Sequence, residues 1–329
     1  MEPHLYSFST WNKSIIETQT LFVVGFQICR AMIPPDFLRS AGATETMNRP
    51  ASIGQAPWTR EQMLAQLQTF ASLYEARPIE HNDGGMLAPH MFMAWFAARC
   101  LRPKVIIESG VWLGQGTWLF EQACPEAQLY CIEPAADRIA YRSKRASYFT
   151  RDFSKIAWKD LPLSETLVFF DDHQNAFERL TTCKKLGFVH ILFEDNYPPA
   201  RGDCYSLKMA LMNSGFSPPR PTSFAGQLKL ALMSLLGATP PNSRKVPPND
   251  ADSAYLHQNV DVYYEFPPVF KTKSTRWHDC WDDERYPTPD PLLQSVTEEY
   301  QRVFFEDART YNWMCYVRLK EDPRNTPPT

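Results

Sequence analysis

The chain has 329 residues, 44% of them hydrophobic, so it can bury one large core plus peripheral elements. Its 34 basic and 37 acidic residues nearly balance and form no basic run. This argues against nucleic acid as the main partner and gives no support to strongly anionic substrates. The eight cysteines show no C-x-x-C pair and no zinc-like spacing, so reduced cysteines in an intracellular compartment are the simplest interpretation.

An apolar segment near the amino terminus bears on localisation. The run Leu21–Cys29 is followed by Arg30 and the pair Pro34-Pro35, well short of the roughly 20 residues that a membrane span needs. The same run has the character of a signal-peptide core, with Ala41-Gly42-Ala43 as a cleavage pattern, although the charged residues between them are unfavourable. A packing helix or a poorly ordered leader is the alternative. We expect a cytoplasmic protein with no stable membrane span, and an endomembrane or secretory fate as the second option.

Two helices are predicted before the first strand. Residues 41–57 are small and polar, so we interpret residues 1–57 as leader and linker and residues 58–329 as a single domain. Thr59 is placed to cap a helix whose apolar residues recur at helical spacing as far as Tyr74. A second helix, from about Met86 to Leu101, carries an aromatic stripe that is by default core. Residues 58–102 should therefore lead into the sheet and cover one mouth of the site.

The stretch from residue 105 to residue 134 reads as strand, glycine turn, helix and second strand. The first apolar run closes on Glu108, and the second run closes on Glu133. Parallel strands deliver their carboxyl ends to one edge of a sheet, so Glu133 should lie beside the turn and accept hydrogen bonds from a ribose diol. Between the two strands lie three glycines, Gly110, Gly114 and Gly116. This pattern indicates half of a nucleotide-cofactor site, and Trp112 stands where a dinucleotide fingerprint requires glycine, which disfavours NAD and FAD.

Acidic residues follow two further apolar strands. The run 167–170 ends in Asp171-Asp172-His173, and the run 188–193 ends in Glu194-Asp195-Asn196. Several carboxylates packed at one edge repel one another, so either some remain protonated or a cation lies among them. Oxygen ligands with few thiols or imidazoles suit Mg²⁺ or Mn²⁺. For any single acid, a solvated loop position is the plainer explanation, and the pairing of two strand ends favours a site.

The order E-x-G-V-x-x-G-x-G-[ST] resembles the first motif of class I S-adenosylmethionine-dependent methyltransferases. In particular it resembles the cephalosporin hydroxylase-like and macrolide sugar O-methyltransferase family, over about residues 100 to 210. The resemblance implies an α/β fold with a doubly wound, mostly parallel sheet, N-terminal helices and a C-terminal helical insertion. It also implies S-adenosylmethionine as cofactor, with contacts from Glu108, Glu133, Asp152 and the three glycines, Gly110, Gly114 and Gly116.

The same resemblance implies a metal held by Asp171, Glu194 and Asp195. The family's fourth-strand motif is usually D-x-x-H or D-x-D-H, and here it reads Asp171-Asp172-His173-Gln174. With Asp171 as metal ligand, Gln174 takes the histidine position; with His173 as base, Phe170 takes the ligand position. We therefore expect that both cannot be in register. His173 is preferred as the catalytic base, because imidazole has a suitable pKa, and Asp172 is the alternative.

The carboxyl-terminal third supplies peripheral elements. A helix is predicted over residues 205–212, ended by Gly215, and an apolar helix over residues 227–236 lies between proline-rich loops. The latter is interpreted as a lid or as the contact of a homo-oligomer, with surface packing as the alternative. Residues 261–266 form a predicted strand, and residues 313–319 a closing strand at the antiparallel edge. The segment 277–283 is aromatic and acidic and is a candidate wall of an acceptor pocket, with simple cover of apolar surface as the alternative.

The resulting hypothesis is an S-adenosylmethionine-dependent, Mg²⁺-assisted O-methyltransferase that acts on a hydroxylated small molecule or sugar. One alternative is a non-catalytic protein that keeps the cofactor-binding sheet, which the shifted fourth-strand motif favours. Another is a metal-dependent hydrolase in which the same acids activate water.

Overall fold

The structure, a computed structural model, describes residues 52–218, 244–311 and 313–321, and these described residues belong to one compact unit. The apolar run 21–29, the candidate cleavage pattern and the predicted helix 227–236 lie outside the described residues. None of the helices within the described ranges combines the length and the apolar character that a bilayer crossing requires.

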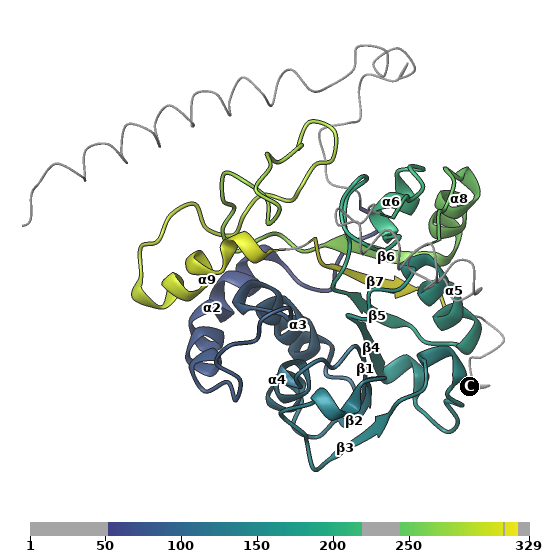
Figure 1. The fold of residues 1–329 in the computed structure, drawn as a ribbon, viewed down its shortest axis with the longest axis horizontal. Helices are drawn as coiled ribbons and strands as arrows, with labels where there is room; N and C mark the ends of the chain where they lie inside the picture. Colours follow the sequence, from purple (N-terminus) through teal and green to yellow (C-terminus); the bar gives the residue numbers. More distant parts are fainter. Residues whose placement is uncertain (1–51, 219–243, 312, 322–329) are drawn as a thin grey trace, which may run out of the picture. The chain divides into compact units, whose positions relative to one another are not determined.

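A seven-stranded sheet forms the centre of this unit, in the order β3-β2-β1-β4-β5-β7-β6 (Figure 1). Five strands are parallel, whereas β7 is antiparallel to both of its neighbours. The strands are β1 (Val105–Ser109), β2 (Gln128–Ile132), β3 (Ala146–Phe149), β4 (Thr166–Phe170), β5 (His190–Phe193), β6 (Val260–Glu265) and β7 (Cys315–Leu319). The predicted doubly wound, mostly parallel sheet is confirmed.

The closing strand occupies a different place from the one predicted. We expected residues 313–319 at the antiparallel edge, but β7 lies between β5 and β6, and β6 is the edge strand. Four of the five β7 residues are fully buried. A strand that is apolar on both faces is stabilised more by an interior position than by an edge, which explains the order.

Helices cover both faces of the sheet. One layer contains α2 (Arg60–Glu75), α3 (Ala88–Leu101) and α4 (Gln115–Ala123), and the other contains α5 (Ala176–Leu186), α6 (Leu207–Leu211) and α8 (Asp250–Asn259) (Figure 1). A short helix, α9 (Arg302–Glu306), packs on the first layer. Successive strand residues alternate between two cores, as Ile106 and Ile107 of β1 show.

Helix boundaries follow local capping chemistry. The Thr59 side chain accepts a hydrogen bond from the backbone N–H of Gln62, whose side chain accepts one from the Thr59 N–H, and this capping box starts α2 as predicted. The second predicted helix begins two residues late, at Ala88, directly before Pro89. The helix α8 was not predicted, because its apolar residues lack a strong helical period, and Asn249 caps it.

Two local predictions need correction. The helix predicted over residues 205–212 spans only Leu207–Leu211, so it ends before Gly215. At Gly215 a β-carbon would lie 2.4 Å from the Val246 carbonyl oxygen, so glycine is needed there for a close chain crossing. The predicted linker also reaches into the folded unit, since Ile53 pairs with Tyr263 of β6.

Candidate functional site

The carboxyl ends of the central strands meet at one edge of the sheet. Backbone hydrogen bonds continue one residue beyond the strands: Gly110 donates to Ile132, Asp171 to Ser109, and Glu194 to Phe170. The turn glycine and the acids that follow β4 and β5 therefore lie side by side, and Glu133 follows β2 at the same level through its bond to Phe149. This convergence is the one expected for parallel strands.

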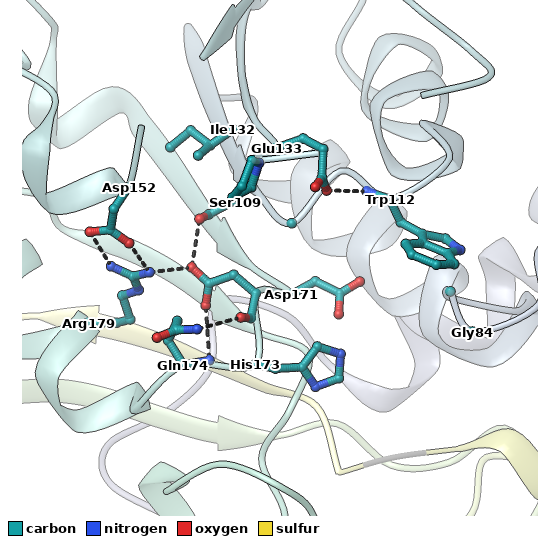
Figure 2. Close-up of a pocket in the computed structure, with 14 residues that line it drawn as sticks. Gly84, Ser109, Trp112, Ile132, Glu133, Asp152, Asp171, His173, Gln174 and Arg179 are labelled. Atoms are coloured by element: carbon teal, nitrogen blue, oxygen red, sulfur yellow. Dashed lines mark hydrogen bonds and ion pairs between the residues drawn. The ribbon is translucent and has the colours of Figure 1, made fainter. Parts of the chain in front are cut away.

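A cavity of about 260 Å³ opens at this edge (Figure 2). Glu133 lines it, and its carboxylate accepts hydrogen bonds from the backbone N–H groups of Trp112, at 3.0 Å, and Ala135, at 2.9 Å. The Trp112 indole donates to the Asp83 carbonyl oxygen, which joins the glycine turn to the Gly84 segment at the rim of the cavity. Glu133 is thus fixed in orientation, and each oxygen keeps a lone pair for a ligand hydroxyl.

The glycines of the turn are required by close chain approaches. Gly110 has a φ of 96°, and a β-carbon there would lie 2.0 Å from the Asp171 carbonyl oxygen. A side chain at residue 110 would therefore push apart the ends of β1 and β4. Gly114 is the N-cap of α4, and Gly116 lies in its first turn, where a β-carbon would lie 2.2 Å from the Glu108 carboxylate. Gly110 lines the cavity, whereas Gly114 lies against the Tyr141 carbonyl oxygen and Gly116 against Glu108, and neither lines this cavity.

Glu108 does not reach any of the described cavities. It is 2% exposed, lies under α4, and its Oε2 accepts a hydrogen bond of 2.5 Å from the Thr117 hydroxyl. Burial raises the pKa of Glu108 to about 8, although the hydrogen bonds from Thr117 and Cys131 oppose that rise. The structure therefore places this predicted cofactor contact in the packing between β1 and α4.

Asp152 and Asp172 share one arginine that the sequence analysis missed. Arg179 Nη2 lies 2.6 Å from an Asp152 oxygen and 2.8 Å from Asp172, and Ser109 donates to Asp172 at 2.7 Å (Figure 2). All four side chains line the first cavity. Burial opposes ionisation of Asp152, but the hydrogen bonds from Arg179 and Ser154 outweigh it and hold its pKa well below the usual range. Burial raises the pKa of Asp172, which Arg179 only partly offsets.

A second group lies where β4 and β5 end. Asp171, His173 and Asp195 each offer a ligand atom, and these atoms lie within 4.8 Å of one another. Glu194, the third predicted metal ligand, is instead bound to His90 of α3, with Nδ1 2.6 Å from Oε1. Burial opposes ionisation of Glu194, but His90 outweighs it and lowers the pKa of Glu194 to about 2. His90 is a second residue that the sequence analysis treated only as part of a core helix.

The backbone turn after β4 brings Asp171 and His173 to the same side. His173 has a φ of 51°, and this left-handed turn lets Asp171 and His173 face the same group although only one residue separates them. The Gln174 side chain instead donates to the Asp172 carbonyl oxygen. Asp171 and His173 thus face one group, while their alignment with the family's motif stays a prediction, and Asp172 faces Arg179.

The residues of this group fit a divalent cation. Burial, followed by the neighbouring carboxylates, raises the pKa of both Asp171 and Asp195 well above the usual range. The Asp195 carboxylate is buried beside Glu194 and Tyr197, whose hydrogen bonds also act on its pKa, and His173 Nδ1 lies 3.2 Å from Oδ2. A cation held by Asp171 and Asp195 would offset the repulsion between these carboxylates, and carboxylate oxygens are ligands that Mg²⁺ or Mn²⁺ accepts.

His173 lines three of the cavities found among the described residues. It lines the first cavity, a second of about 230 Å³ with Glu194 and His90, and a third of about 520 Å³ with Tyr197 and Trp277. A hydrogen bond to Asp203, and then the charge of Asp195, raise the pKa of His173 to about 11. The predicted role of segment 277–283 as a pocket wall is consistent with the place of Trp277.

Comparisons with known proteins identify structural similarity. No protein-family model matches the chain, and no curated protein matches it. Similar solved structures include the S-adenosylhomocysteine-bound methyltransferase PaMTH1 of Podospora anserina, with 13% identity, coverage of 97% of this chain and 100% of that chain, and a TM-score of 0.39. The O-methyltransferase TomG of Streptomyces achromogenes, solved with S-adenosylmethionine, has 16% identity, coverage of 57% and 81%, and a TM-score of 0.29. An O-methyltransferase of Bacillus cereus, solved with S-adenosylhomocysteine, has 15% identity, coverage of 66% and 86%, and a TM-score of 0.29. At these values the similarity concerns the fold alone.

Proposed function

We propose that the chain is an S-adenosylmethionine-dependent O-methyltransferase that activates an acceptor hydroxyl at a site for Mg²⁺ or Mn²⁺. The main support for the proposal is that a cofactor-type cavity and a buried acidic group lie at the same edge of the sheet. Glu133 lies in the first cavity, Asp171 lies in both the first and the second, and His173 connects them to the third. Methyl transfer needs a donor and an acceptor in adjoining spaces, and this arrangement provides them.

The first cavity is assigned to the donor. Glu133 would accept hydrogen bonds from the ribose diol, while Asp152, fixed by Arg179, would contact the adenine. The missing side chain at Gly110 leaves the backbone open to the amino acid part of the donor. Trp112 and Gly84 close the rim, where water would otherwise enter.

The acidic group is assigned to the acceptor. Asp171 and Asp195 would hold the cation. As a Lewis acid, the cation would lower the pKa of the acceptor hydroxyl. His173 would take the hydroxyl proton, and Asp203, 3.2 Å from Nδ1, keeps its ring oriented. The hydrogen bond with Asp203 favours the protonated ring most, so only the neutral fraction of His173 takes the proton, and a cation that balances the charge of Asp195 and Asp171 would raise that fraction. Asp172 positions Arg179 and Ser109 on the donor side.

Calorimetry with S-adenosylmethionine tests this assignment. Glu133→Ala should weaken binding by about 1–3 kcal/mol, because a ribose diol would lose charge-assisted hydrogen bonds. Glu133→Gln keeps an acceptor oxygen for Trp112 and should weaken binding less. Glu126→Ala is the matched control, since Glu126 is exposed just before the other end of β2. Equal affinity of folded Glu133→Ala and wild type, or preferential binding of NAD, would overturn the donor site.

Methyl transfer then separates an enzyme from a binding protein. The wild-type chain, supplied with Mg²⁺ and labelled S-adenosylmethionine, should transfer label to at least one polyol, catechol or glycoside. Donor binding without any transfer would favour the non-catalytic alternative.

A further inference from the structure

The third cavity has the features of an acceptor subsite. Its volume of about 520 Å³ exceeds that of the donor cavity, and it meets the acidic group at His173. Its lining includes Arg276 and Trp277, together with Tyr197 and Arg201. Arg276 also lines the second cavity, which contains Asp171 and Glu194, so one guanidinium borders both spaces on the acceptor side.

The loop that carries Arg276 and Trp277 is firmly held. Its ends pair through Ser274 and Cys280, and the Thr275 backbone N–H donates to the Asp279 carbonyl oxygen at 2.8 Å. Thr275 is 3% exposed, and its hydroxyl bonds the Asp279 carboxylate. These contacts close a short turn and present its tip to the cavity in one orientation, as a preorganised site requires.

An aromatic surface lines this cavity. The Trp277 ring is stacked on Trp313, with centroids 6.0 Å apart and planes 14° apart, and Tyr197 lies 5.7 Å away at a tilt. Trp313 is itself fixed, since its indole donates to Thr288 at 3.1 Å. Trp277 nevertheless stays 38% exposed. A supported and partly exposed indole is suited to stacking on a planar ring or on the C–H face of a sugar.

Several charged side chains around the cavity form ion pairs with one another. Asp279 pairs with Arg201, and Asp203 pairs with His173. Arg276 is different: among the residues that the structure describes, no carboxylate lies within 4.0 Å of its guanidinium, which lies 5.7 Å from the Trp277 ring. An arginine in this position has its planar donors available for a carboxylate on a ligand.

From these observations we infer that the acceptor is a hydroxylated ring compound that bears a carboxylate, with the ring on Trp277 and the carboxylate on Arg276. The inference rests on the proposed function, because it assigns the acceptor of that reaction. The ring places its hydroxyls toward Asp171 and His173, and its acid group points away from them. The composition of the chain gave no support to anionic substrates. At this cavity, Arg276 by itself favours a ligand with a carboxylate.

Matched acids and amides test the inference by calorimetry on the full chain with Mg²⁺ and S-adenosylhomocysteine. The probes are 3,4-dihydroxybenzoate against 3,4-dihydroxybenzamide, for an aromatic ring, and glucuronate against glucuronamide, for a sugar. In at least one pair the acid should bind about three- to tenfold more tightly, the range expected for an ion pair that is partly screened by solvent. The pair that shows the preference identifies the ring class. High salt should reduce the ratio, since it screens an exposed charge.

Variants separate charge from stacking. Arg276→Gln should bring the acid-to-amide ratio close to one, whereas Trp277→Leu should weaken the acid and the amide equally. Arg302→Gln is the matched control, because Arg302 is an exposed arginine on α9 that pairs only locally with Glu299, and it should keep the preference. Thermal melting and S-adenosylhomocysteine binding establish that each variant is folded.

Three results would overturn the inference: equal binding of acid and amide by wild type, a preference that survives in Arg276→Gln, or no binding of any of the four probes. If S-adenosylhomocysteine binding and methyl transfer persist in such a case, only the carboxylate subsite fails. If S-adenosylhomocysteine itself does not bind, the proposed function fails, and the inference fails with it.

Discussion

A buried ion pair next to the acidic group is the most quantitative test of the structure. Lys208 and Glu265 are each about 1% exposed as side chains, with Nζ 2.7 Å from Oε2, and Lys208 also donates to the Pro287 carbonyl oxygen at 2.8 Å. Tyr263 donates to the other Glu265 oxygen, and Asn196, the residue after Asp195, donates to Tyr263. The pair therefore joins α6, β6 and the loop after β5.

Lys208→Met should destabilise the protein by about 3–5 kcal/mol. The substitution leaves the Glu265 carboxylate buried with one remaining partner, and an uncompensated buried charge carries a cost of that size. The double variant Lys208→Met/Glu265→Gln removes the charge as well, keeps an acceptor for Tyr263, and should lose only about 1–2 kcal/mol. The melting temperature of the single variant should fall by about 6–20 °C, at about 2–4 °C per kcal/mol for a domain of this size.

Equilibrium unfolding in denaturant, followed by fluorescence with a refolding check, measures these differences. Lys104→Met is the matched control, because Lys104 and Glu165 form an exposed pair that should contribute less than about 0.5 kcal/mol. A loss below about 1 kcal/mol in Lys208→Met, or a double variant less stable than the single one, would refute the buried charge pair. S-adenosylmethionine affinity should stay unchanged, since none of these residues lines the first cavity.

Three further predictions concern the site and its surroundings. Asp171→Asn/Asp195→Asn should abolish Mn²⁺ binding in calorimetry and weaken the donor less than Glu133→Ala does, and retained Mn²⁺ binding would exclude this group as the metal site. His173→Ala should lower kcat by about 10²–10⁴-fold at constant donor affinity, whereas Asp172→Asn should mainly weaken the donor; the reverse pattern would make Asp172 the base. Glu108 has its pKa raised from 4.5 to about 8 on folding, so wild type should lose stability as the pH rises from 4.5 to 8, because the folded state keeps a proton that the unfolded state releases. Glu108→Gln should remove this pH dependence, so its free energy of unfolding should rise by up to a few kcal/mol relative to wild type between pH 5 and pH 8 in denaturant titrations. Parallel stability curves of variant and wild type against pH would show that Glu108 is ionised when buried.

The sequence determined the features that depend on neighbouring residues. Apolar runs that end in acids define β1, β2, β4 and β5, because a strand is built from residues next to one another and its end is marked by a polar residue. The convergence of Glu133, Asp171 and Glu194 at one edge followed from the geometry of parallel strands. The cap at Thr59 followed likewise from a motif that spans four residues.

The tertiary structure decided the features that depend on distant partners. The burial of Glu108 follows from the approach of α4 at Gly116, and the pairing of Glu194 with His90 follows from the packing of α3 on the sheet. Arg179 carries no local signal of its role, because Asp152 lies 27 residues before it and faces it only through the folded sheet.

The same reason applies to the order of strands and to the acceptor wall. The sequence of β7 shows that it is apolar, but whether it becomes an edge or an interior strand depends on where β6 pairs. Tyr197 and Trp277 meet although 80 positions separate them, and a left-handed residue at His173 turns two nearby side chains into one group. Backbone turns and long-range packing set these contacts, and neither leaves a periodic pattern in the sequence.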